Sequence, residues 1–430
     1  MFVSAFPRLA VAAGLALAVA ACQSSSTDKT ATTPEATTGL AGPLREGPWR
    51  AVLTTQGQQI PFLFEVEKDS ANQPIVVLRN GEEKLRLDEI TTAGDSTTIR
   101  LGAFDAALVV RPDGNGQLKG SWVKYDAKEP YRVPLTASLG GQQRFLPTTT
   151  TKAADFNGTW STTFKDGDKT YPAVGVFKQR GNEVTGTFLT NTGDYRYLAG
   201  QVNGDTLKVS TFDGSHGFLF TATQPTDSTL TGDFYSGKAG HETWTAVKDA
   251  NAQLPDADGL AAMKPGEKKL TFQFPSIADK NTTLSPTDPK YQGKVVVVQI
   301  LGSWCPNCMD ETNFLAPWYE QNKQRGVEVI GLGYERSPEY AKAAERLRKM
   351  KDRFNVGYDI AVAGTSTSAD ASKSLPQLSK VLAFPTTIFL DKKGEVRKIH
   401  TGFSGPGTGQ YYDQEKAAFN KTIDALLAEK

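Results

Sequence analysis

The pattern of apolar and polar positions along the chain changes near residue 260. From residue 46 to about 250, short runs alternate apolar and polar residues and are separated by turn pairs such as Asn80-Gly81 and Asn203-Gly204. Such runs are typical of antiparallel strands with one buried face. Beyond residue 266, helical patterns alternate with short apolar runs. The sequence therefore predicts an all-β region followed by an α/β domain over 266–430.

The all-β region repeats itself. Trp49 corresponds to Trp160, and further pairs follow at a separation of about 110 residues. These further pairs are Pro61 with Pro172, Gly94 with Gly204, Phe104 with Phe212, and Gly120 with Gly232. We expect two copies of one module, over 46–140 and 155–249, each with about eight strands in a small barrel or a sandwich. Their aromatic side chains are expected mainly to form the core rather than a ligand cavity.

One run in the α/β region has the character of a strand buried on both faces. Lys294–Leu301 is almost wholly apolar and rich in valine, as in a central strand of a covered sheet. Apolar residues at helical spacing predict a helix over 309–324, and Gly326 stands where a C-cap glycine is expected. Cys305 and Cys308 fall between strand and helix, so we expect both at a helix N-terminus.

That position favours redox chemistry. Unpaired backbone amides and the positive end of the helix dipole stabilise a thiolate, which makes Cys305 the expected nucleophile. Cys308 is expected to attack the resulting mixed disulfide. A structural disulfide would close too short a loop to stabilise the fold much. A zinc site would need further ligands, and haem attachment a histidine in place of Met309.

Residues 266–430 resemble the TlpA/ResA-like thiol-disulfide oxidoreductases, a branch of the thioredoxin superfamily. The resemblance rests on Gly293-Lys294-Val295-Val296, Trp304-Cys305-Pro306-Asn307-Cys308, the strand pattern over 326–331, and Phe384-Pro385-Thr386-Thr387. It implies a thioredoxin-like fold in which Pro385 is cis, lies against the cysteine pair, and borders a backbone edge where a substrate segment pairs.

The resemblance also implies a role for one carboxylate. Thioredoxins carry a buried aspartate six residues before the first cysteine, where this chain has Gln299. The family tends to place a glutamate three residues after the second cysteine, and Glu311 stands there. Glu311 is either a proton shuttle for Cys308 or a solvated carboxylate of the first helical turn. The chain departs from the family at Asn313, where a proline is common.

The first residues predict export. An apolar, alanine-rich run that is too short to span a membrane comfortably fills most of 1–21, as in a signal peptide. Val19-Ala20-Ala21-Cys22 resembles the bacterial lipoprotein signal, which implies that Cys22 carries the lipid. Gln23 follows in place of an aspartate, which favours the outer membrane, facing the periplasm. Residues 22–45 are small and polar, so we expect a flexible tether.

Composition narrows the functional classes. The chain has 48 Lys and Arg residues and 47 Asp and Glu residues. It therefore has no excess of positive charge with which to bind nucleic acid. With Cys22 lipidated, only Cys305 and Cys308 remain, and the histidines (His216, His241 and His400) show no metal-ligand spacing. We therefore expect a membrane-tethered reductase of protein disulfides that needs no metal or organic cofactor, only a redox partner as electron donor.

Three alternatives remain open. The first is a peroxiredoxin-like peroxidase, although Gly302 stands where that family usually has threonine or serine. The second is a copper-delivery protein, whose cysteines are spaced differently. The third is a non-enzymatic binding lipoprotein in which the β modules carry the function and the dithiol is incidental.

Overall fold

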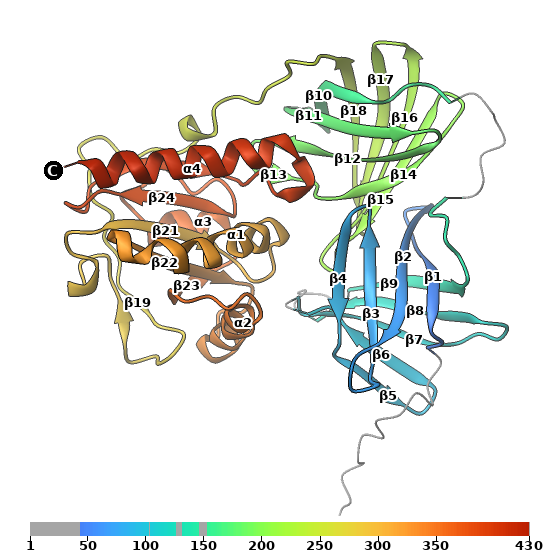
Figure 1. Ribbon diagram of the computed structural model, residues 1–430, viewed down its shortest axis with the longest axis horizontal. Helices are drawn as coiled ribbons and strands as arrows, with labels where there is room; N and C mark the ends of the chain where they lie inside the picture. The colour runs from blue at the N-terminus through green and yellow to red at the C-terminus, as the bar shows by residue number, and fades with distance from the viewer. Residues whose placement is uncertain (1–43, 103, 126–130, 146–152, 430) are drawn as a thin grey trace, which may run out of the picture. The chain divides into compact units, whose positions relative to one another are not determined.

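The computed structural model describes residues 44–102, 104–125, 131–145 and 153–429 (Figure 1). The expected signal segment 1–21, the expected lipidation site Cys22 and nearly all of the tether 22–45 lie outside the described residues. Within the ranges that the structure describes, no helix has the length and apolar character needed to cross a membrane.

The first module is a nine-stranded antiparallel sheet in the order β4-β3-β2-β1-β9-β8-β7-β6-β5. Its strands are β1 (Gly47–Thr55), β2 (Gln58–Lys68), β3 (Pro74–Asn80), β4 (Glu83–Leu87), β5 (Ile90–Ala93), β6 (Ser96–Arg100), β7 (Ala106–Pro112), β8 (Gln117–Lys124) and β9 (Tyr131–Leu139). β4 and β5 are the two edge strands, and they are not paired with each other in the described residues. The sheet is therefore open and does not form a closed barrel.

The second module closes into a barrel. Its strands are β10 (Gly158–Asp166), β11 (Lys169–Arg180), β12 (Glu183–Thr190), β13 (Gly193–Asp194), β14 (Leu198–Asn203), β15 (Thr206–Phe212), β16 (Gly217–Thr226), β17 (Thr229–Ser236) and β18 (Gly240–Lys248). The ring closes because β11 pairs with both β10 and β12, while β12 also pairs with β14. Aromatic side chains fill the barrel: Trp160, Phe164, Phe177, Phe188, Phe220 and Trp244 are all buried. They form a core, as expected.

The two modules share structural details that follow from the sequence repeat. The indole nitrogen of Trp49 donates to the carbonyl of Arg45, and that of Trp160 donates to the carbonyl of Phe156, both at 2.9 Å. Such paired details indicate one module present in two copies.

The modules are also joined by a common core and a buried cation. Phe212 of the second module packs into the core of the first, where its ring lies 4.4 Å from that of Phe62. Arg144 is buried between the modules, and its guanidinium donates to acceptors on both sides: the carbonyls of Pro61, Arg79 and Ser210, the hydroxyl of Ser210, and Asn80 Oδ1.

The C-terminal domain is built on a five-stranded sheet in the order β23-β22-β21-β24-β25. Its elements are β19 (Phe274–Pro275), β20 (Thr283–Leu284), β21 (Val295–Leu301), α1 (Pro306–Asn322), β22 (Val327–Glu335), α2 (Tyr340–Arg353), β23 (Asp359–Thr365), α3 (Ser368–Ser374), β24 (Thr386–Leu390), β25 (Val396–Thr401) and α4 (Gln410–Ala428). β21 is parallel to β22 and antiparallel to β24. Every residue of β21 is buried, as its apolar run predicted.

Helices cover both faces of this sheet. Side chains of α1, α2 and α4 share one hydrophobic core with β21 and β22. Ala371 of α3 and the segment that precedes β21 belong to the core on the opposite face. All-β, barrel-like modules therefore precede an α/β domain of thioredoxin-like type, in agreement with the expected fold class.

Local predictions differ from the structure at one helix. The sequence predicts an exposed loop over 364–374 and a helix around 375–382, whereas α3 occupies Ser368–Ser374. The Thr367 side chain caps this helix by accepting from the amide of Asp370, which makes a polar segment helical. Leu375 and Leu378 are buried just beyond the helix, so their apolar character reflects burial in the turn.

Candidate active site

The cysteine pair lies where β21 gives way to α1. Cys305 is the N-cap residue of α1, and its sulfur accepts a hydrogen bond from the amide of Cys308 at 3.2 Å. The pair is in the dithiol form. The sulfur of Cys305 therefore satisfies an amide that a helix N-terminus otherwise leaves unpaired, which favours negative charge on that sulfur.

The second cysteine is the more shielded of the two. Cys305 is 5% exposed and Cys308 is fully buried. Burial raises the pKa of the Cys308 thiol well above its ordinary value, and the neighbouring sulfur of Cys305 and the charge of Glu311 raise it further. Cys308 is thus held as a neutral thiol until a base removes its proton.

The loop that contains Pro385 lies against Cys305. The peptide bond between Phe384 and Pro385 is cis, as the family resemblance implied. The Cys305 thiol donates to the carbonyl of Phe384 at 3.5 Å, and the Pro385 carbonyl accepts from the amide of Gly402 at 2.9 Å. Pro385 therefore lies beside the cysteine pair.

Glu311 is buried within a polar network, with 4% of its surface exposed. Its carboxylate accepts from the side-chain amide of Gln299 at 2.8 Å and from the hydroxyl of Thr387. The carbonyl of the Gln299 side chain accepts in turn from the Tyr358 hydroxyl at 2.9 Å. Burial raises the pKa of Glu311 to about 7. The alternative of a solvated first-turn carboxylate does not fit this burial.

Each histidine lies within hydrogen-bonding distance of a carboxylate. His400 lies between Asp258, at 3.0 Å, and Glu415, at 2.9 Å. Burial lowers the pKa of His400, but the two carboxylates outweigh it and bring the pKa to about 10. Among the residues with described positions, no three His, Cys, Asp or Glu side chains gather as a metal site would need.

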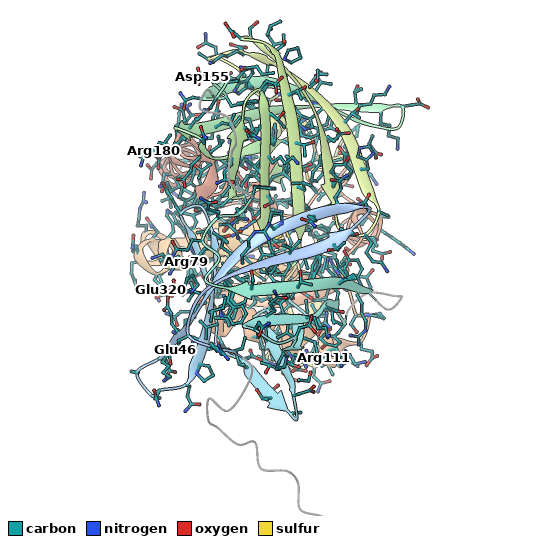
Figure 2. The ribbon with its side chains drawn as sticks, turned by 90° about the vertical axis from the view of Figure 1, so that its right-hand side faces the viewer. Glu46, Arg79, Arg111, Asp155, Arg180 and Glu320 are labelled. Atoms are coloured by element: carbon teal, nitrogen blue, oxygen red, sulfur yellow. The ribbon has the colours of Figure 1, made fainter. Side chains whose placement is uncertain are left out.

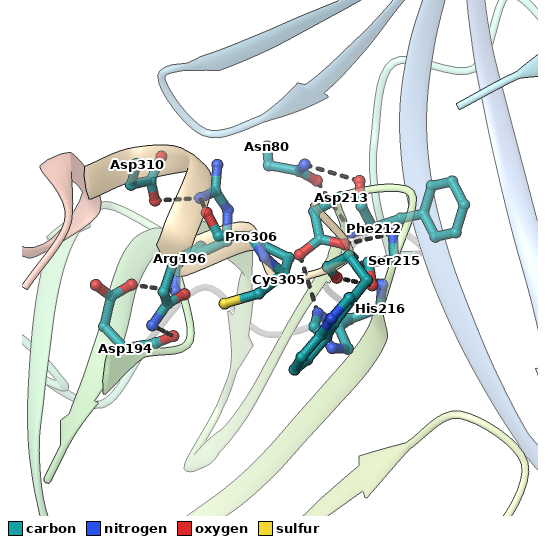
Figure 3. Close-up of polar contacts among 12 residues, drawn as sticks. Asn80, Asp194, Arg196, Phe212, Asp213, Ser215, His216, Cys305, Pro306 and Asp310 are labelled. Atoms are coloured by element: carbon teal, nitrogen blue, oxygen red, sulfur yellow. Dashed lines mark hydrogen bonds and ion pairs between the residues drawn. The ribbon is translucent and has the colours of Figure 1, made fainter. Parts of the chain in front are cut away.

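Residues of the second β module contact the segment 304–308, which contains the two cysteines and which we call the redox motif (Figure 3). The sequence did not predict these contacts. Arg196 donates to the carbonyl of Pro306 at 3.1 Å, and the side-chain amide of Asn307 donates to the carbonyl of Asp194 at 3.2 Å. Ser215 donates to the carbonyl of Trp304 at 3.3 Å. These partners are about 90 to 110 positions apart in sequence, so no local pattern marks them.

Arg196 also joins three parts of the chain through ion pairs. Its guanidinium pairs with Asp310 in α1 and with Glu83 at the start of β4 in the first module. Burial acts to lower the pKa of Arg196, but the charges of Asp310 and Glu83 hold it above its ordinary value. Arg196 is therefore a permanent cation beside the redox motif.

Comparisons with known proteins agree on the C-terminal part of the chain. Residues 264–416 match the Redoxin family. ResA, a thiol-disulfide oxidoreductase of Halalkalibacterium halodurans, is 26% identical over 139 residues, which cover 32% of this chain and 69% of ResA. The Geobacillus kaustophilus ResA is 29% identical over 112 residues, which cover 26% of this chain and 57% of the relative. The match to this second relative thus spans little more than half its length.

A crystal structure of a thiol:disulfide interchange protein of the thioredoxin family from Chlorobium tepidum is also similar. It is 16% identical, covers 39% of this chain and 100% of its own, and has a TM-score of 0.29. The family match and the ResA relatives identify residues 264–416 as a redoxin domain related to the ResA thiol-disulfide oxidoreductases.

Proposed function

We propose that this chain is an exported, membrane-tethered thiol-disulfide oxidoreductase that reduces protein disulfides through Cys305 and Cys308. One observation carries the proposal: the sulfur of Cys305 caps α1 by accepting from the Cys308 amide, next to the cis bond before Pro385. A dithiol at a helix N-terminus is suited to thiol-disulfide exchange, because the helix end stabilises the attacking thiolate. The ResA relatives are named for the same chemistry.

The first step joins enzyme and substrate. The Cys305 thiolate attacks one sulfur of the substrate disulfide, the substrate S–S bond breaks, and the departing thiolate takes up a proton. A mixed disulfide between Cys305 and the substrate results. The amide of Cys308 stabilises negative charge on the Cys305 sulfur before the attack.

The second step releases the substrate. Cys308 loses its proton and attacks the sulfur of Cys305, which breaks the mixed disulfide and leaves the Cys305–Cys308 disulfide. Two electrons have then passed from the dithiol to the substrate. Glu311 is the base in this step, because its pKa of about 7 suits proton transfer near neutral pH. Pro385 shapes the wall beside Cys305, where the substrate segment lies.

A reductase needs its dithiol restored, so we propose a separate redox partner as electron donor and no metal or organic cofactor. We expect the reduction potential of the Cys305/Cys308 couple to lie near the thioredoxin value of about −270 mV. The measurement is equilibration of the full chain in dithiol/disulfide buffers, with the reduced fraction read by alkylation and mass spectrometry. A potential near the value of about −120 mV of strong oxidants would reverse the proposed direction.

The proposed reductase activity is tested by reduction of insulin disulfides, with Cys305→Ala as the matched inactive chain. We expect turnover with wild type and none above background with the variant. Equal rates in the two chains would show that the dithiol is not the reactive group.

We also propose that Cys22 carries a lipid, that 22–45 is a tether, and that the β modules over 46–140 and 155–249 present the redoxin domain at the outer membrane, facing the periplasm. We expect Cys22→Ser to release the protein from the membrane fraction with insulin reductase activity unchanged. The measurement is fractionation of cells followed by immunoblotting, with Ser24→Ala as the control. Continued membrane attachment of Cys22→Ser would contradict lipidation at this residue.

A further inference from the structure

Residues from outside the redoxin domain contact the segments on either side of the proposed nucleophile. Cys305, the proposed nucleophile, is only 5% exposed, although exchange requires that a substrate sulfur reach it. Two of these contacts come from one stretch of the second β module, 191–197, which we call the cover loop. It contains β13 and the turn to β14.

The cover loop contacts two segments of the redoxin domain. Arg196 and the carbonyl of Asp194 bind the motif at Pro306 and Asn307. The carboxylate of Asp194 accepts from the amide of Gly405 at 2.7 Å, in the segment that follows β25. These contacts hold the cover loop against both the motif and the neighbouring segment.

The cover loop also occupies the edge beside the proline loop. Gly402, whose amide binds the carbonyl of Pro385, lies directly against the cover loop. A Cβ atom added to Gly402 would approach the backbone nitrogen of Gly193 to 3.0 Å. A substrate segment that pairs beside Pro385 would therefore meet Gly193.

The sequence of the cover loop suits this close approach. Gly193 has a φ of +135°, and a Cβ atom there would lie 1.9 Å from the side-chain nitrogen of Asn307. The backbone conformation favours glycine, and a side chain there would displace the Asn307 amide group, which donates to the carbonyl of Asp194. The contact thus depends on a specific residue of the β module.

An ionic contact holds the cover loop in place. Arg196 is buried between Asp310 of the redoxin domain and Glu83 of the first module. Without its guanidinium, both buried carboxylates would lose their cation, which strongly disfavours the closed arrangement. Arg196 is thus the residue on which closure depends most.

We propose that the cover loop is an autoinhibitory element: it closes the redox centre in the described arrangement and must lift before a protein disulfide reaches Cys305. This inference rests on the proposed function, because it concerns access to the same dithiol. Arg196 is the positioning residue that holds the cover closed, and it touches neither sulfur.

The test measures access to Cys305 in the reduced, full-length chain. Alkylation by small N-ethylmaleimide and by bulky polyethylene-glycol maleimide is followed on the Cys305 peptide by mass spectrometry. In wild type, we expect the bulky reagent to react far more slowly than the small one. Equal rates of the two reagents in wild type would overturn the proposal without any variant.

Two variants are expected to weaken the contacts of the cover loop with the redoxin domain in different ways. Arg196→Gln keeps the length of the side chain and removes its charge, and Gly193→Ala introduces the clash with Asn307. We expect each to speed alkylation by the bulky reagent at least about tenfold. Insulin reduction is expected to rise in parallel.

Matched controls come from the same module. Arg180→Gln removes an exposed cation at the end of β11, and Gly181→Ala places a Cβ at a φ of +61° in open space (Figure 2). Neither control should change the alkylation rate. Circular dichroism establishes that each variant is folded before its rate is compared.

The outcomes separate this inference from the proposed function. Unchanged alkylation of Cys305 in both folded variants, with insulin reductase activity present, would overturn the cover and leave the function intact. Faster alkylation in both variants, with no reductase activity in any chain, would support the cover and overturn the proposed function.

Discussion

Cys308→Ala is expected to accumulate mixed disulfides between Cys305 and its substrates, because the sulfur that resolves them is missing. Cys305→Ala is expected to accumulate none, since Cys308 is fully buried and its thiol is held neutral. Turnover should fall by at least about a thousandfold in both variants, as for removal of a nucleophile that acts in a unit. Non-reducing gels followed by mass spectrometry identify the trapped species.

Cys22→Ser is the control for this experiment, because it removes the remaining cysteine of the chain and leaves the dithiol untouched. It should trap no substrate and keep full turnover. If Cys305→Ala and Cys308→Ala trapped the same partners equally, the assignment of nucleophile and resolving cysteine would be wrong.

Glu311→Gln should slow turnover by about a hundredfold or more, because it removes the proposed base for Cys308. The fold should persist, since a glutamine oxygen can still accept from Gln299 and its amide can donate to the hydroxyl of Thr387. Loss of the charge should lower the pKa of Cys308, which Glu311 raises. Single-turnover reduction of a disulfide substrate across a pH series measures both effects.

Glu320→Gln is the matched control for that variant, because Glu320 lies on the same helix α1 but is exposed and pairs with Lys323 at the surface (Figure 2). Its pH profile should coincide with that of wild type. Coincident profiles for Glu311→Gln and wild type would remove the proton-transfer role of Glu311.

The pH dependence of the free energy of unfolding should report on the Glu311 carboxyl group independently of turnover. The pKa of Glu311 rises on folding from 4.5 to about 7, so the folded chain keeps a proton that the unfolded chain loses between these values. The free energy of unfolding should therefore fall as pH rises through this window. Glu311→Gln should flatten that fall in part, because burial also raises the pKa of Asp194 and Glu335 to about 7. Urea titrations at several pH values give the slope.

The parts of the fold that were predicted are those with strong local patterns. Val295–Leu301 is a buried strand because its apolar run has no polar face to expose. Gly326 ends the turn after α1 at a φ of +90°, a conformation that glycine tolerates. The repeat between the modules was visible because tryptophans such as Trp49 and Trp160 are rare enough to align.

The parts that were missed depend on contacts distant in sequence. The second module closes because β12 pairs with both β11 and β14, whereas in the first module β3 pairs with β2 and β4 and the sheet stays open. The alternation of apolar and polar residues within a strand does not specify its partner strands. The ion pairs of Arg196 with Glu83 and Asp310 span more than one hundred residues and leave no trace in a local pattern. The contacts of Arg196 and Asp194 with Pro306 and Asn307 are of the same long-range kind, so the sequence did not predict them.

The buried guanidinium of Arg144 has a mechanical consequence for the whole chain. Its acceptors lie in both β modules, and Phe212 of one module completes the core of the other. Pulling the modules apart would expose that core and leave a cation without partners in a dry interface. The two modules therefore behave as one rigid unit, in which neither can rotate against the other without breaking these contacts.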